Sequence, residues 1–137
     1  IDTYKLLAEV NKQAGKAGRT VNCLLQIHVA QEETKFGFSP EECREMLDAG
    51  EWKALAHVRI CGLMGMASNT DNIEQINGEF RLLNSLFKEI KENWFADSDV
   101  FRELSMGMSH DYHEAIASGS TLVRVGSKIF GEREYNI

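Results

Sequence analysis

Apolar residues recur along the chain with two alternating periods, one typical of helices and one typical of strands. A spacing of three to four residues predicts a helix over residues 2–17, capped by Asp2 or Thr3 and ended by the glycines at 15 and 18. Residues 21–30 instead alternate, so that Leu25 and Ile27 share one face. This period of two predicts a strand.

The next segment carries a full set of helix-boundary signals. In "SPEECREMLDAG", Ser39 is placed to be the N-cap, Pro40 the first helical residue and Glu42 the partner in a capping box. Gly50 follows the last helical residue and is typical of a stop. We therefore expect a helix between Ser39 and Gly50.

The remaining chain repeats this alternation of strands and helices. Strands are predicted over residues 58–67, 103–109 and 121–126. Between the first two, an apolar stripe from Ile73 to Ile90 predicts a long helix. A short helix is predicted from Ser109, as its N-cap, to Gly119, as its stop.

The resulting order, α-β-α-β-α-β-α-β, predicts an α/β fold with a parallel sheet. No linker or low-complexity segment interrupts it, so residues 1–137 are expected to form a single domain. The strands are short and carry polar or glycine positions, which suits a (β/α) barrel at least as well as an open sheet. A closed TIM-type (β/α)8 barrel needs at least about 200 residues. Four strands are about half of one, and a helix with no strand before it suggests the C-terminal half.

Composition and charge narrow the class of protein. The chain has 137 residues, 43% hydrophobic and 26% charged, with a net charge of −6, so a nucleic-acid partner is not expected. No apolar run approaches the roughly 18 residues of a membrane span. The three cysteines, Cys23, Cys43 and Cys61, lack C-x-x-C spacing and are expected to be reduced thiols in a cytoplasmic protein.

Two glycine and serine pairs end the last two predicted strands, in "MGMS" and "VRVGS". In barrel enzymes the loops after strands 7 and 8 often bind phosphate. Ser109 can offer a hydroxyl, and the backbone N–H groups of residues 109–111 are expected to point out of a helix start, where an anion is favoured. Gly126 and Ser127 can do the same from the neighbouring strand. The alternative is that both serines are only caps and the glycines only turn residues.

Arg124 interrupts the apolar strand "TLVRVG". Alternation puts Leu122 and Arg124 on one face of the sheet, and Val123 on the other, beneath the outer helices. The guanidinium then points toward the barrel interior, where an unpaired charge is costly. It needs either a carboxylate, in a purely structural salt bridge, or a ligand.

At this point the sequence resembles a known family. "LSMGMSHDYHEAIASGSTLVRVGSKIFGER" closely resembles the C-terminal signature of the pyridoxal phosphate homeostasis proteins, whose fold is similar to the N-terminal barrel of alanine racemase. "LLQIHVAQEETKFGF" and "ICGLMGMA" resemble two further segments of that family, and the resemblance covers nearly all 137 residues. One departure is His28, where the family commonly has asparagine.

The resemblance implies a binding site for pyridoxal 5′-phosphate. It makes Ser109, Gly126 and Ser127 phosphate ligands and puts Arg124 against the pyridine nitrogen. An arginine donates a hydrogen bond and keeps its proton, so the ring stays neutral and is a weaker electron sink. This favours a small-molecule cofactor carrier without catalytic residues of its own. The alternative is an amino-acid racemase, but a racemase often needs a tyrosine at a strand end. None of the three tyrosines is predicted there: Tyr4, Tyr112 and Tyr135.

The lysine that forms the Schiff base with the cofactor lies, in this family, on the first strand of the barrel. No residue here matches that motif, and Lys35 is predicted to be a solvated loop lysine. His110 and His113 are predicted to be surface histidines rather than metal ligands, since no Cys or carboxylate set completes a site. A four-stranded half barrel leaves open edges and an uncovered apolar face, so such a fragment is expected to self-associate.

Overall fold

The computed structural model describes residues 1–32 and 36–131. Helices and strands alternate along these residues as the sequence predicts. The elements are α1 (Tyr4–Lys16), β1 (Val21–Gln26), α2 (Pro40–Ala49), the short 3-10 helix η1 (Glu51–Ala54), β2 (Val58–Met64), α3 (Ile73–Trp94), β3 (Glu103–Met108), α4 (Tyr112–Ala117), β4 (Leu122–Arg124) and α5 (Ser127–Phe130). The prediction did not include η1 or α5.

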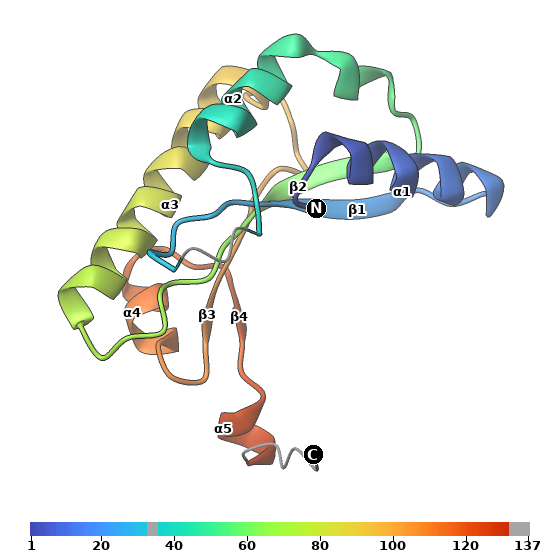
Figure 1. Ribbon diagram of the computed structural model, residues 1–137. Coiled ribbons are helices and arrows are strands. Elements are labelled where there is room, and N and C mark those ends of the chain that lie inside the picture. The colour runs from blue at the N-terminus through green and yellow to red at the C-terminus, as the bar shows by residue number, and fades with distance from the viewer. Residues whose placement is uncertain (33–35, 132–137) are drawn as a thin grey trace.

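The four strands form one sheet in the order β1-β2-β3-β4, and every neighbouring pair is parallel. Sequential parallel strands joined by helices are the arrangement expected of half a (β/α)8 barrel. Helices α2, α3 and α4 run along one side of this sheet (Figure 1). The predicted α/β class and four-stranded parallel arrangement are confirmed.

Local signals set most of the helix boundaries. Thr3 caps α1 by accepting from Leu6 N–H, and the capping box between Ser39 and Glu42 is present at α2. Gly50 ends α2 in the left-handed conformation, at φ 77°. Gly15 does not end α1 as predicted, because the helix continues to Lys16.

The strands are shorter than the alternating patterns suggested. β1 ends at Gln26, and beyond it Ile27 makes only a single parallel bridge to Phe38. The outer edge of β1 is engaged by Ile1: its ammonium donates to Leu24 O, and its carbonyl accepts from Gln26 N–H. These two bonds follow the pattern of a parallel ladder.

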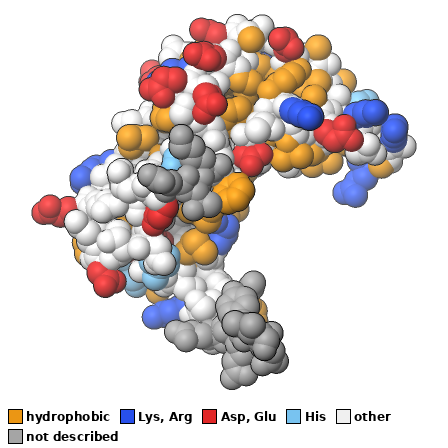
Figure 2. Space-filling view, in the orientation of Figure 1, with side chains coloured by type: hydrophobic (Ala, Val, Ile, Leu, Met, Phe, Trp, Pro, Cys, Tyr) orange, Lys and Arg blue, Asp and Glu red, His pale blue; other side chains and the backbone are white. Residues whose placement is uncertain are grey.

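One hydrophobic core lies between the sheet and the helices. Its fully buried members come from α1, β1, α3 and β3, among others: Leu7, Leu25, Phe80, Leu83, Ile90, Phe101, Leu104 and Met106. The alternate strand positions, such as Leu24 on β1 and Leu122 on β4, are only partly covered or exposed. In the space-filling view, side chains on the visible face are mixed, with acidic groups over α2 (Figure 2). No helix in the described ranges is long and apolar enough to cross a membrane.

β2 and β3 approach each other too closely for a side chain at Gly62. This residue has φ 153°, and a Cβ there would overlap the carbonyl oxygen of Glu103, its register partner. Only glycine fits such a close backbone contact. Gly62 therefore fixes how β3 docks on β2, and β3 in turn carries the candidate site.

Candidate functional site

The ends of β3 and β4 are held together by a hydrogen bond between the segments that follow them. The Oγ of Ser109, just after β3, accepts from the main-chain N–H of Lys128 in α5, at 3.0 Å. The two glycine and serine segments singled out in the sequence therefore lie side by side at the C-terminal ends of the strands. Ser109 does not cap α4, so that prediction is wrong: the helix begins at Tyr112, with Asp111 at the N-cap position.

Gly126 and Ser127 form the opposite wall of this corner. Both are exposed, and a Cβ added to Gly126 would meet nothing within 4 Å. Their main-chain N–H groups have no hydrogen-bond acceptor within residues 1–32 and 36–131. The Ser109 hydroxyl and these two N–H groups are the kind of donors that hold a phosphate.

Asp111 is buried beside this corner, at 2% exposure. Its Oδ1 accepts from Met108 N–H at 2.7 Å, and its Oδ2 lies 3.3 Å from His110 Nε2. The Asp111 N–H itself donates to Met108 O, so the expectation that residues 109–111 all point free N–H groups outward is wrong. The carboxylate thus bonds to the end of β3 and stabilises the turn between β3 and α4.

Arg124 crosses the sheet toward the ends of β3 and β2. Its Nε donates to the Oγ of Ser105 at 3.2 Å, and its Nη2 donates to the carbonyl of Gly65 at 3.1 Å. No carboxylate within the described ranges lies within 4.0 Å, so the structural salt bridge weighed above is not formed there. Burial lowers the pKa of the Arg124 guanidinium, and the charge of Asp111 opposes this effect. Nη1 has no acceptor among residues 1–32 and 36–131.

A second buried network ties the loops after β1 and β2 to α3. The carboxylate of Glu79, 6% exposed, accepts from the N–H of Ser68 at 2.6 Å and from its hydroxyl at 2.7 Å. The Ser68 Oγ accepts in turn from Gln31 N–H at 2.7 Å. Glu32 Oε1 accepts from Asn69 N–H, and this bond lowers the pKa of Glu32. These bonds tie residues 31 and 32, after β1, to residues 68 and 69, after β2.

Of the other sequence candidates, His110 lies beside this corner, 3.3 Å from Asp111. Among the described residues no group of three or more His, Cys, Asp or Glu side chains is placed to hold a metal ion, and His113 instead contacts the Tyr112 ring at 4.1 Å. Lys35 and Tyr135 lie outside the described residues. Tyr4 sits in α1, not at a strand end.

Sequence reasoning missed the residues that support the corner: Ser105, Gly65 and Lys128. Ser105 lies on the same face as Arg124 by strand alternation, so its role was within reach of the pattern. The contact with Gly65 could not be predicted, because it depends on the register of β2 and β3. The sequence pattern does not determine that register.

Comparison with known proteins identifies the family of this chain. The family model for the alanine racemase N-terminal domain matches residues 1–134. The chain belongs to this family. It is 36% identical over 135 residues to a pyridoxal phosphate homeostasis protein of Aquifex aeolicus, covering 98% of this chain and 57% of that protein. To the human protein of the same name it is 36% identical over 139 residues, covering 99% and 50%. The chain thus spans about half the length of these relatives.

Solved structures of this family share the fold. PipY of Synechococcus elongatus, determined without PLP, superposes with a TM-score of 0.85 at 30% identity, covering 96% of this chain and 59% of that one. The same protein with PLP bound gives a TM-score of 0.80 at 28% identity, covering 96% and 58%. An alanine racemase of Clostridium difficile, at 13% identity and a TM-score of 0.63, shows the fold alone. The family resemblance of the sequence is confirmed.

Proposed function

We propose that this chain is the phosphate- and ring-holding part of a pyridoxal 5′-phosphate homeostasis protein, which binds the cofactor and does not itself catalyse a reaction on it. The observation that carries the proposal is the corner where Ser109 meets Lys128, four residues along the chain from Arg124 at the end of β4. The relatives named pyridoxal phosphate homeostasis protein and the PLP-bound PipY support it.

The phosphate is assigned to the corner between β3 and β4. The Ser109 hydroxyl and the N–H groups of Gly126 and Ser127 are donors, and none of them needs a proton transfer to bind a dianion. Gly126 leaves open space where a side chain would stand. The Asp111 carboxylate, which would repel a phosphate, is turned onto the Met108 N–H.

The pyridine nitrogen is assigned to Arg124. Ser105 and Gly65 hold Nε and Nη2, so the guanidinium is oriented before the cofactor arrives. An arginine keeps its proton and donates a hydrogen bond, which leaves the ring nitrogen unprotonated. When bound, the cofactor supplies an electron sink, and this contact keeps that sink weak.

Covalent attachment is assigned to a lysine outside this chain, since no residue here matches the family's motif for it. We therefore expect the chain to dock the cofactor through the phosphate and ring contacts alone. A cytoplasmic location remains a prediction, with which the three free thiols agree.

Docking without covalent attachment is tested with pyridoxamine 5′-phosphate, which has the phosphate and ring but no aldehyde. Calorimetric titration of the 137-residue chain is expected to show saturable binding, weakened about tenfold or more in a Ser109→Ala, Ser127→Ala double variant, which keeps the main-chain donors and loses both hydroxyls of the corner. Ser118→Ala, at the end of α4 and away from the corner, is the matched control. Equal affinity in the double variant and the control would contradict the assignment.

A racemase is the second function that the fold allows. The likeness to alanine racemase is one of fold only. The described tyrosines also lie in or at the start of helices rather than at strand ends, with Tyr4 in α1 and Tyr112 opening α4. No observation favours racemisation.

A further inference from the structure

Helix α3 presents one carboxylate to the core of the protein. Glu79 lies on the buried face of this helix, among apolar residues such as Phe80 and Leu83, and is 6% exposed. Burying a carboxylate is costly unless hydrogen-bond donors or a cation surround it. No lysine, arginine or histidine in the described ranges lies within 4.0 Å of Glu79. In this part of the chain the carboxylate is therefore stabilised by hydrogen bonds alone.

Most of these bonds come from one residue of the β2–α3 loop, residues 65–72. The Oε1 of Glu79 accepts from the main-chain N–H of Ser68 at 2.6 Å, and Oε2 accepts from the Ser68 hydroxyl at 2.7 Å. Gln75, one turn earlier in α3, donates a further bond to Oε2 at 3.3 Å. Ser68 is itself buried, at 2% exposure. The carboxylate thus fixes both the main chain and the side chain of Ser68.

The same face of α3 also contacts the start of this loop, at Gly65. A Cβ added to Gly65 would lie 2.7 Å from Leu83 Cδ2 and 3.3 Å from Ile27 O, so the main chain there runs close against the helix. Leu83 is one turn after Glu79, and residues at this spacing lie on one face of a helix. Helix α3 therefore holds the loop at two points, by packing at Gly65 and by hydrogen bonds at Ser68.

Gly65 provides a carbonyl that orients Arg124. This carbonyl accepts from Arg124 Nη2 at 3.1 Å. The Gly65 N–H donates to Ser105 O at 3.0 Å, and the Oγ of Ser105 accepts from Arg124 Nε. A displacement of the β2–α3 loop would therefore move an acceptor of Arg124 directly.

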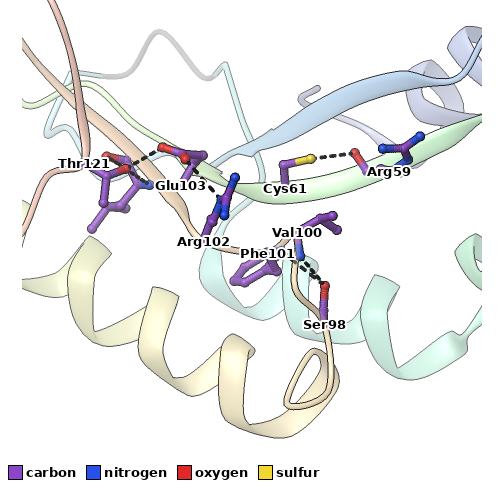
Figure 3. Close-up of polar contacts among 9 residues, drawn as sticks. Arg59, Cys61, Ser98, Val100, Phe101, Arg102, Glu103 and Thr121 are labelled. Carbon is purple, nitrogen blue, oxygen red and sulfur yellow. Dashed lines mark hydrogen bonds and ion pairs between the residues drawn. The ribbon is translucent and has the colours of Figure 1, made fainter.

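The strand that carries Arg124 is fixed separately from this loop. Just before β4, Thr121 Oγ1 donates to Glu103 Oε2 at 2.8 Å, as Figure 3 shows, and accepts from Leu104 N–H at 2.8 Å. These bonds tie β4 to β3 without involving α3. The β2–α3 loop is thus the part of the surroundings of Arg124 that depends on Glu79.

We propose that Glu79 is a positioning residue for the cofactor site. Through Ser68 it fixes the β2–α3 loop, so that the Gly65 carbonyl holds Arg124 in the orientation that the pyridine ring requires. A donor that is held in place before binding reduces the entropy lost when the ligand binds. The proposal rests on the function assigned above, in which Arg124 binds the ring nitrogen. The orienting bonds form in the free protein, so this role also has a readout that needs no ligand.

The first test follows Arg124 in the free chain by ¹⁵N NMR. The Arg124 Nε–H signal is identified by its absence from Arg124→Gln. In Glu79→Leu this proton is expected to exchange with solvent at least about fivefold faster than in the parent. Glu79→Gln keeps the shape of the side chain and one acceptor oxygen, so it should lie closer to the parent. Glu89→Gln is the matched control, because it removes a carboxylate of the same helix that pairs with Arg44 instead.

The second test compares two ligands by calorimetry. Pyridoxamine 5′-phosphate carries the ring nitrogen, whereas benzyl phosphate has a phosphate and a ring without it. Glu79→Leu is expected to weaken binding of pyridoxamine 5′-phosphate about tenfold and to change binding of benzyl phosphate by less than about twofold. If Glu79→Leu does not fold, Ser68→Ala removes only the hydroxyl and gives the same comparison with a smaller effect.

Three results would overturn the positioning role: unchanged Arg124 exchange in the folded variants, equal loss of affinity for both ligands, or the same effects in Glu89→Gln. A fall in unfolding temperature without a change at Arg124 would likewise leave Glu79 a purely structural residue. If the parent chain binds no pyridoxamine 5′-phosphate, the function assigned above fails, and the exchange of the Arg124 proton alone decides whether Glu79 positions it.

Discussion

A single half-buried cation, Arg124, lies at the centre of the candidate cofactor site. Arg124, on β4, donates to a side chain on β3 and to a main-chain carbonyl after β2. Its position therefore depends on how three strands are arranged. Strand alternation predicted the face it occupies. The same alternation puts Ser105 on that face, but the contact with Gly65 could not be predicted from the sequence, because it depends on the register of β2 and β3.

Replacing Arg124 by glutamine is expected to lower affinity for pyridoxamine 5′-phosphate about tenfold or more. Glutamine is shorter and uncharged, so the charge-assisted donor to the ring nitrogen is lost. Calorimetry on the folded variant measures the effect, with Arg81→Gln on the exposed side of α3 as control. Undiminished affinity in folded Arg124→Gln would remove this residue from the site.

Cys43 makes the stability of the protein depend on pH in alkali. The thiol is fully buried in α2, and burial raises its pKa from 9.0 to about 12. Above pH 9 the unfolded chain loses this proton while the folded chain keeps it, so the free energy of unfolding falls as pH rises toward 12. The full loss is on the order of 4 kcal/mol, at about 1.4 kcal/mol per pH unit.

Urea unfolding at pH 8, 9 and 10 measures that slope. Cys43→Ala is expected to be less stable overall but to lose less stability between pH 9 and 10. Cys61→Ala, at a partly exposed position, should keep the parent's slope. A parallel pH dependence in all three proteins would rule out Cys43 as the cause.

At the scale of elements, the sequence correctly predicted helix boundaries that are set by contacts within the helix itself. The α2 boundaries were correct because Ser39, Glu42 and Gly50 act within one helix. The start of α4 was wrong because Ser109 is recruited by Lys128, nineteen residues later. A serine before a helical segment has the same local pattern whether it caps that segment or bonds to a neighbouring element, so only the fold distinguishes the two.

Replacing Gly62 in β2 and Gly78 in α3 by alanine is expected to change stability in opposite directions. Gly62→Ala is expected to destabilise the protein by about 2–4 kcal/mol, because the new Cβ overlaps Glu103 O at a positive φ. Gly78→Ala is expected to stabilise it by about 0.5–1 kcal/mol, because the site lies within α3 with nothing within 4 Å. Thermal unfolding of both variants checks the pair, and equal melting temperatures would refute the close contact between β2 and β3.

At the scale of the whole molecule, the sequence pattern predicted four parallel strands and the side on which their helices lie. It did not predict the contact of Arg124 with Gly65, because these residues are 59 positions apart and only the pairing of β2, β3 and β4 brings them together.

The sheet also leaves apolar side chains without cover. Leu122 on β4 is 43% exposed, and β4 has a strand neighbour on one side only within the described sheet. We expect the chain to self-associate at high micromolar concentration through this edge. Light scattering should give a mass above 15.5 kDa, reduced toward it by Leu122→Lys.

Leu82→Lys is the matched control for that experiment. Leu82 is 49% exposed but lies on α3, away from the strand edge. The control should associate as the parent does. A monomer at all concentrations, or equal effects of the two lysine substitutions, would contradict association through β4.

The bonds between Ile1 and β1 have a practical consequence for labelling. Ile1 engages the main-chain groups of Leu24 and Gln26 on the outer edge of β1, so a bulky fluorophore on either residue would disturb that edge. The exposed turn around Arg19, between α1 and β1, precedes the start of β1, whereas the corner between β3 and β4 lies at the C-terminal ends of the strands. A reporter attached there would leave the corner between β3 and β4 free for the cofactor proposed above.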